Sequence, residues 1–142
     1  MVIGSGIKGI QIGLLGSCLM LGTAVSLAHG DIRSERVEFK KGMNSAVVEG
    51  KIKGYEKVDY ILKARANQYM NVSLATKHKG IYFNILEPGE SQVYMFNGAA
   101  NSNQFESSLR STGDYTIRVY MNGAAARRNE TGQYRLEMVL GS

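Results

Sequence analysis

Along most of the chain after residue 28, apolar and polar residues alternate with a period of two. The segment 69–74 shows this most clearly, because Met70, Val72 and Leu74 share one face. Successive side chains of a strand point to opposite faces, so the alternation indicates half-buried strands rather than helices. The predicted strands are 36–39, 46–52, 58–64, 69–74, 81–86, 93–96, 104–109, 114–121 and 133–140.

Turn residues separate these segments at short intervals, and no linker or internal repeat interrupts them. Many short strands with turn signals between them are typical of an antiparallel sandwich or barrel. We predict an all-β fold, an antiparallel and jelly-roll-like β-sandwich of about eight or nine strands, forming one domain over residues 29–142. A short helical turn is predicted at 124–128, because Ala and Arg favour helix.

The N-terminal stretch 1–28 predicts a targeting segment rather than part of the fold. It carries one charge, Lys8, followed by an apolar middle and a small-residue end. This order is typical of a secretory signal peptide. Ser26 and Ala28 occupy the −3 and −1 positions of a cleavage site before His29. Cleavage there would give an exported, periplasmic protein.

Two other interpretations of this stretch stay open. An uncleaved membrane anchor is one, although the run is short for a full membrane span. Lipoprotein anchoring through Cys18 is the other, because residues 15–18 read Leu-Gly-Ser-Cys. The GxGxxG pattern at 4–9 follows no strand, so it does not predict a nucleotide site.

Composition excludes several classes of protein. One cysteine cannot form a disulfide framework, and two histidines with that cysteine cannot form a Cys/His zinc module. The formal net charge of +5 is compatible with nucleic-acid binding, but export argues against it. We therefore expect no nucleic-acid partner and no membrane contact after signal removal, and read the charge as attraction to anionic envelope surfaces.

No catalytic or metal-binding constellation is evident. His78 lies between two lysines, which predicts a solvated turn, and His29 falls at the cleavage site. Glu87 and Glu90 flank the only Pro-Gly pair, and a solvated turn is again the prediction in preference to a weak Ca²⁺ site. We expect no enzyme activity, no cofactor and no metal.

The residues that favour binding are basic and aromatic. Arg127 and Arg128 lie in the long segment 122–132, and arginine offers planar, bidentate donors for carboxylates. A solvated or internally paired loop is the equally open alternative. Tyr55 lies in the turn 53–57, where core packing explains an aromatic side chain less easily.

Five segments of the sequence carry a resemblance to a known family. They read GYEKVDY at 54–60, AR at 64–65, YFNILEPG at 82–89, GDYTIRVY at 113–120 and AARRNE at 125–130. Their order and spacing resemble the bacterial periplasmic inhibitors of goose-type and invertebrate-type lysozymes, over nearly the whole chain after residue 28. The GDYTIRVY strand also resembles pre-peptidase C-terminal domains, whereas AARRNE is more distinctive.

The resemblance implies a β-sandwich that blocks a lysozyme active-site cleft by inserting surface loops. Carried over by position, Tyr55 and Arg127 match lysozyme contacts, and Arg128 and Asn129 are adjacent candidates. Gly123 departs from the family, because relatives often carry another arginine there. This departure removes one expected contact.

The partner is left open between goose-type and invertebrate-type lysozyme, and the YFN and AARRNE segments look slightly closer to the invertebrate-type inhibitors. A homodimer is a further open prediction. The alternative function is a non-catalytic, cell-wall or polysaccharide-binding β-sandwich module of the pre-peptidase type.

Overall fold

The computed structural model describes residues 31–142. The predictions that concern the signal peptide 1–28, cleavage before His29 and anchoring through Cys18 lie outside the described residues. Within residues 31–142, no helix is both long and apolar enough to cross a membrane.

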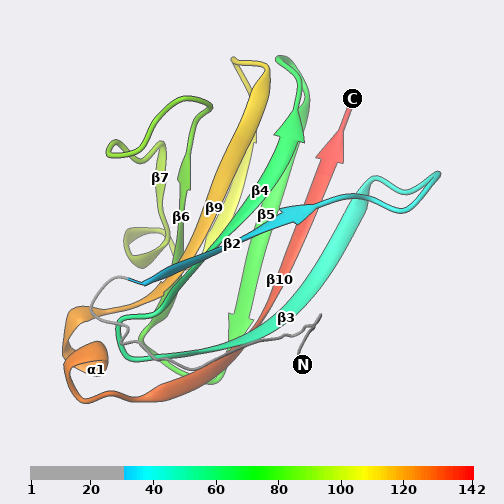
Figure 1. The fold of residues 1–142 in the computed structure, drawn as a ribbon. Coiled ribbons are helices and arrows are strands. Elements are labelled where there is room, and N and C mark those ends of the chain that lie inside the picture. The colour runs from blue at the N-terminus through cyan, green and yellow to red at the C-terminus, as the bar shows by residue number, and fades with distance from the viewer. Residues whose placement is uncertain (1–30) are drawn as a thin grey trace, which may run out of the picture.

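Two sheets pack face to face, which confirms the predicted β-sandwich (Figure 1). One sheet has four strands in the order β3-β10-β5-β8, and the other has five in the order β2-β4-β9-β6-β7. The strands are β2 (Ile32–Val37), β3 (Ser45–Lys53), β4 (Lys57–Ala64), β5 (Tyr69–Thr76), β6 (Ile81–Leu86), β7 (Phe96–Asn97), β8 (Gln104–Ser108), β9 (Gly113–Met121) and β10 (Thr131–Gly141). Two short helices, η1 (Gly98–Ala100) and α1 (Gly123–Arg127), complete the described fold.

Two edge strands differ from the sequence prediction. Strand β2 begins before the predicted 36–39 segment and overlaps it only at residues 36 and 37. It pairs in parallel with β4, whereas the other described pairs are antiparallel. Only Val37 of β2 is buried, so this strand has no apolar alternation to reveal it. The predicted strand 93–96 retains only Phe96 and adds Asn97, because Val93 lies exposed in the preceding loop.

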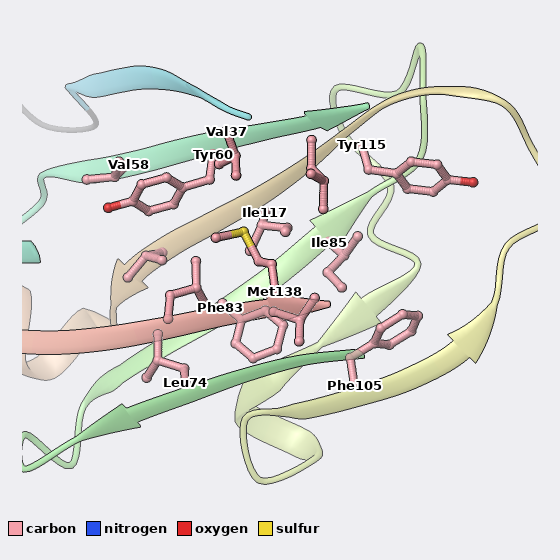
Figure 2. Close-up of a cluster of buried hydrophobic side chains, with 14 of the residues drawn as sticks. Val37, Val58, Tyr60, Leu74, Phe83, Ile85, Phe105, Tyr115, Ile117 and Met138 are labelled. Atoms are coloured by element: carbon pink, nitrogen blue, oxygen red, sulfur yellow. The ribbon is translucent and has the colours of Figure 1, made fainter. Parts of the chain in front are cut away.

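The core lies between the sheets and is built from the apolar faces of the predicted strands (Figure 2). Phe83, Ile85 and Ile117 come from the five-stranded sheet, and Leu74 and Met138 face them from the four-stranded sheet. Burial of one such side chain stabilises a fold by roughly 1.5–3 kcal/mol. The period-two pattern therefore has a direct energetic cause.

Three tyrosines contribute to this core and keep their hydroxyl groups hydrogen-bonded. The hydroxyl oxygens of Tyr60 and Tyr134 lie 2.6 Å apart across the two sheets, and Tyr115 donates to the Ser111 carbonyl at 2.7 Å. Burial raises the pKa of Tyr134 far above its usual range. Gly50 lies against the Tyr134 hydroxyl, where a Cβ atom would clash. The pair thus links the sheets at a position that requires glycine.

Three connections meet at the end of the sandwich that carries α1 (Figure 1). They are the β3–β4 turn at 54–56, the β5–β6 turn at 77–80 and the β9–β10 connection at 122–130. We refer to these three segments together as the loop cluster. All four residues predicted to bind a partner lie within it.

Candidate functional site

Two backbone hydrogen bonds join the three segments of the loop cluster. The Gly54 amide donates to the Glu130 carbonyl at 2.9 Å, and the Asn122 amide donates to the Gly80 carbonyl at 2.8 Å. The segment 122–130 therefore lies between the two turns and is tied to both. The sequence separates these residues widely, but the antiparallel topology brings them together.

Helix α1 has identifiable start and stop signals. Asn122 has an extended backbone, and its side-chain oxygen accepts a hydrogen bond from the Ala125 amide at 2.9 Å, which makes it the N-cap. Ala125 and Ala126 form the buried face of this helix. Asn129 has a φ of 56°, and asparagine tolerates this left-handed conformation better than most residues. The helix therefore ends after one turn, which confirms the predicted helical turn to within a residue.

The two arginines of this segment have different environments. Arg128 Nε donates to Glu130 Oε2 at 2.6 Å, so this guanidinium is internally paired. Arg127 is exposed and forms no ion pair with any residue in 31–142. A Cβ atom at Gly123 would lie 3.5 Å from Arg127 Nη1. Arg127 is therefore the guanidinium available to a partner, and Gly123 leaves room beside it.

The prediction that His78 lies in a solvated turn is wrong. Its Nε2 lies 2.7 Å from Glu130 Oε1, its Nδ1 accepts from the Gly80 amide at 2.9 Å, and its side chain is only 18% exposed. Because Nδ1 accepts a hydrogen bond, Nε2 carries the proton and donates to the carboxylate. The flanking lysines are exposed while His78 turns toward a residue 52 positions later, and no local pattern signals that contact.

Glu130 is the centre of the loop cluster. Its carboxylate accepts from Arg128 and from His78, and its carbonyl accepts from Gly54. The hydrogen bond from Arg128, followed by that from His78, lowers the pKa of this carboxyl. One residue therefore holds the β3–β4 turn, the β5–β6 turn and the arginine segment in a fixed relation. Glu130 is not among the site residues predicted from the sequence.

Tyr55 is half-buried in the β3–β4 turn, next to a glycine that the site requires. Gly54 has a φ of +62°, and a Cβ atom there would lie 2.6 Å from Asn129 Oδ1. Glu56 Oε1 accepts from the Lys53 amide at 2.8 Å and closes the turn. The turn that carries Tyr55 therefore packs against the end of α1, beside Asn129.

Glu87, at the opposite end of the sandwich, is also paired. Glu87 forms two hydrogen bonds with Arg110, at 2.8 and 3.0 Å, and these lower the pKa of its carboxyl. The prediction of a solvated turn at 87–90 is therefore wrong for Glu87, because its side chain is paired and only 18% exposed. Among residues 31–142, no group of three or more His, Cys, Asp or Glu side chains could hold a metal ion.

The geometry of the loop cluster suits binding. An exposed guanidinium, a tyrosine and an asparagine share one end of the molecule, and the nearby His78 and Glu130 are already hydrogen-bonded to each other. The fold and the cluster together define a small β-sandwich that presents a basic loop surface.

Comparisons with known proteins identify the family. No protein-family model matches the chain. The inhibitor of g-type lysozyme from Escherichia coli K12 is 31% identical over 135 residues, which are 93% of this chain and 96% of the relative. The chain belongs to the family of periplasmic inhibitors of g-type lysozyme, as its sequence resemblance predicted.

Solved structures of similar proteins support the same family. The periplasmic inhibitor of g-type lysozyme (PliG) from Aeromonas hydrophila is similar with a TM-score of 0.72 and 31% identity, covering 78% of this chain and 97% of that chain. The Salmonella Typhimurium PliG has a TM-score of 0.61 and 29% identity, covering 76% and 97%. These relatives are named for g-type lysozyme and not for the invertebrate type.

A pre-peptidase C-terminal domain of a Bacillus anthracis collagenase shares the fold, with a TM-score of 0.54 and 19% identity over 80% of this chain and 99% of that chain. Its likeness extends to the fold alone. The family assignment therefore favours the inhibitor interpretation over the polysaccharide-binding module.

Proposed function

We propose that this protein inhibits a g-type lysozyme by placing the loop cluster in the active-site cleft of that enzyme. The observation that supports this most directly is the exposed Arg127, which forms no ion pair within residues 31–142 and lies on a segment that Glu130 holds in place. Because the backbone that carries Arg127 is already held, it loses little conformational freedom on binding, so more of the interaction energy appears as affinity.

Arg127 would pair with a carboxyl group in the cleft. Glycoside hydrolases generally cleave with a carboxylic acid that protonates the leaving group. A guanidinium hydrogen-bonded to that acid favours its ionised form, which cannot donate the proton. Arg127 would therefore both bind the enzyme and remove its general acid.

Tyr55 would occupy a sugar subsite beside that acid. Its ring is rigid and amphipathic, as is typical of residues that dominate protein interfaces. Arg128 and Asn129 would lie at the rim, because Arg128 already pairs with Glu130 and Asn129 contacts the Gly54 turn.

A panel of lysozymes tests the proposal. The purified protein is titrated against g-type, invertebrate-type and chicken-type enzymes in a cell-wall lysis assay. We expect inhibition of the g-type enzyme at or below micromolar protein, and inhibition of the invertebrate type would extend the target range. Absence of inhibition of every class would refute the function. Sedimentation of the same samples tests the predicted homodimer.

A further inference from the structure

Three of the eight tyrosines gather on the outer face of the five-stranded sheet, away from the core. Tyr82 of β6 and Tyr120 of β9 are register partners, and their ring centroids lie 6.1 Å apart at a 40° angle. Tyr94, in the connection that precedes β7, is 43% exposed and interacts with Arg118 on the same face. We call Tyr82, Tyr94 and Tyr120 the tyrosine face.

The polar groups of this face already have hydrogen-bond partners within the protein. The Tyr82 hydroxyl donates to the Lys79 carbonyl at 3.0 Å. Arg118 forms two hydrogen bonds with Asp59, at 2.7 and 2.9 Å, and this pair is largely buried. Burial raises the pKa of Tyr120, so its hydroxyl stays neutral. Tyr82 is thus anchored to the β5–β6 turn, and the charged pair on this face is already neutralised.

The tyrosine face continues directly into the loop cluster. Tyr82 follows Gly80 by two residues, and Tyr120 precedes Asn122 by two. The Asn122 amide donates to the Gly80 carbonyl, and the Asn122 side chain caps α1. Strand β9 leads into α1 at this end of the sandwich (Figure 1). The two surfaces therefore share one rigid frame.

Interface size indicates that the loop cluster needs such a neighbour. A stable protein–protein interface buries about 800 Å² per partner and involves roughly 20–30 residues a side. The three segments of the loop cluster together hold 16 residues, of which Gly54, Gly80, Ala125 and Ala126 are buried, so the cluster alone falls short of that. The outer face of the four-stranded sheet also adjoins the cluster, but there it carries Glu49 and Lys51, and glutamate and lysine are depleted at interface centres where tyrosine is enriched.

We infer that the tyrosine face forms the second half of the lysozyme-binding surface, contacting the enzyme beside its cleft while the loop cluster enters it. This inference rests on the proposed function. It adds Tyr82 and Tyr120 as principal contacts and Tyr94 as a peripheral one.

The test compares inhibition by the wild type with that by a Tyr82→Ala/Tyr120→Ala double variant. We expect the double variant to inhibit g-type lysozyme about tenfold or more weakly. Tyr69→Ala is the control, because Tyr69 is a strand tyrosine that is more exposed than Tyr82 and Tyr120, at 44%, but lies at the start of β5, at the opposite end of the sandwich. We expect that variant to inhibit like the wild type. Thermal unfolding of each variant verifies that the sandwich is intact.

Hydroxyl-radical footprinting of the wild type keeps the inference testable if the double variant does not fold. We expect g-type lysozyme to protect Tyr82 and Tyr120 and to leave Tyr69 reactive. Two results would overturn the inference and leave the proposed function standing. One is that lysozyme does not protect the two rings. The other is that a folded double variant inhibits like the wild type while Arg127→Ala inhibits more weakly. If the wild type inhibits no lysozyme, both fall.

A pull-down on lysozyme-free peptidoglycan separates the remaining alternative. We expect no retention that depends on these rings. Retention by the wild type that the double variant loses, with unchanged inhibition, would assign the tyrosine face to glycan binding and contradict the inference.

Discussion

Each end of the sandwich carries paired arginines and one exposed arginine, but the two ends brace the exposed one differently. At the end opposite α1, Arg36 pairs with Asp114 and Arg110 pairs with Glu87, each through two hydrogen bonds, and Arg65 is exposed with no ion pair among residues 31–142. At the α1 end, Arg128 is paired, but Arg127 is exposed and forms no ion pair within the described residues. Solvent-exposed ion pairs stabilise a fold little. An unpaired arginine on a braced loop is instead suited to a partner.

The ends also differ in what supports them. The far-end ion pairs are side-chain contacts at the surface, whereas Glu130 joins three chain segments through its carboxylate and its carbonyl. Changes at the far end should therefore leave inhibition intact, and changes around Glu130 should impair it. Four predictions test this contrast, from the largest expected effect to the smallest.

The largest effect is expected from Arg127→Ala. Losing a buried charge contact at an interface costs about 2 kcal/mol or more, so inhibition of g-type lysozyme should weaken by at least about tenfold. Arg65→Ala is the matched control, because Arg65 is also exposed but follows β4 at the far end. An unchanged inhibition constant for Arg127→Ala would remove this residue from the contact.

A smaller loss is expected from Gly54→Ala. The new Cβ atom would meet Asn129 Oδ1, and the positive φ adds strain of about 1–3 kcal/mol. Gly42→Ala is the matched control, because Gly42 has a φ of +80° with nothing within 4 Å of a Cβ atom. Both variants should unfold at lower denaturant, but only Gly54→Ala should inhibit several-fold less. Equal inhibition by the two would show that the turn's packing does not matter.

Two conservative variants of His78 should have opposite outcomes. Glutamine places a donor near the Nε2 position and keeps the bond to Glu130, whereas asparagine reaches only the Nδ1 position near Gly80. We expect His78→Gln to inhibit nearly as well as the wild type and His78→Asn to inhibit about fivefold less, the cost of one hydrogen bond. Inhibition constants of the two variants, measured side by side, show which hydrogen bond of His78 supports inhibition. The reverse order would assign that support to the contact with Gly80.

Acidification should weaken the carboxylate contacts that stabilise both ends of the sandwich, but only the contacts at the α1 end should matter for inhibition. The folded-state pKa values of Glu87 and Glu130 are both lowered by hydrogen bonds, so each contributes stability above its ordinary value of 4.5 that is lost as pH falls toward the folded pKa. Denaturant unfolding across this range should show a smaller pH dependence for Glu87→Gln and for Glu130→Gln. At neutral pH only Glu130→Gln should weaken inhibition. Weaker inhibition by Glu87→Gln would contradict the contrast.

The sequence predicted the sandwich because burial imposes a period of two on its strands. Met70, Val72 and Leu74 were placed on one face by spacing alone, and all three are buried. The bounds of strand β2 were not predicted, because an edge strand with one buried residue shows no such pattern. Its parallel pairing with β4 has no local signature in the sequence.

The site was predictable only in part. Resemblance located Tyr55, Arg127, Arg128 and Asn129, and the fold brings them to one end, although their contacts with an enzyme remain a proposal. What holds them there was not predictable, because the bond between His78 and Glu130 joins residues 52 positions apart. Contacts of this range depend on topology, and His78 between two lysines gives no sign of its partner.

Inhibition kinetics with a soluble cell-wall oligosaccharide test the central claim most directly. If the loop cluster occupies the active-site cleft of a g-type lysozyme, the protein and the substrate exclude each other. The apparent KM should then rise linearly with inhibitor concentration from its uninhibited value, while kcat stays constant. A fall in kcat at unchanged KM would place the inhibitor outside the cleft and contradict the account.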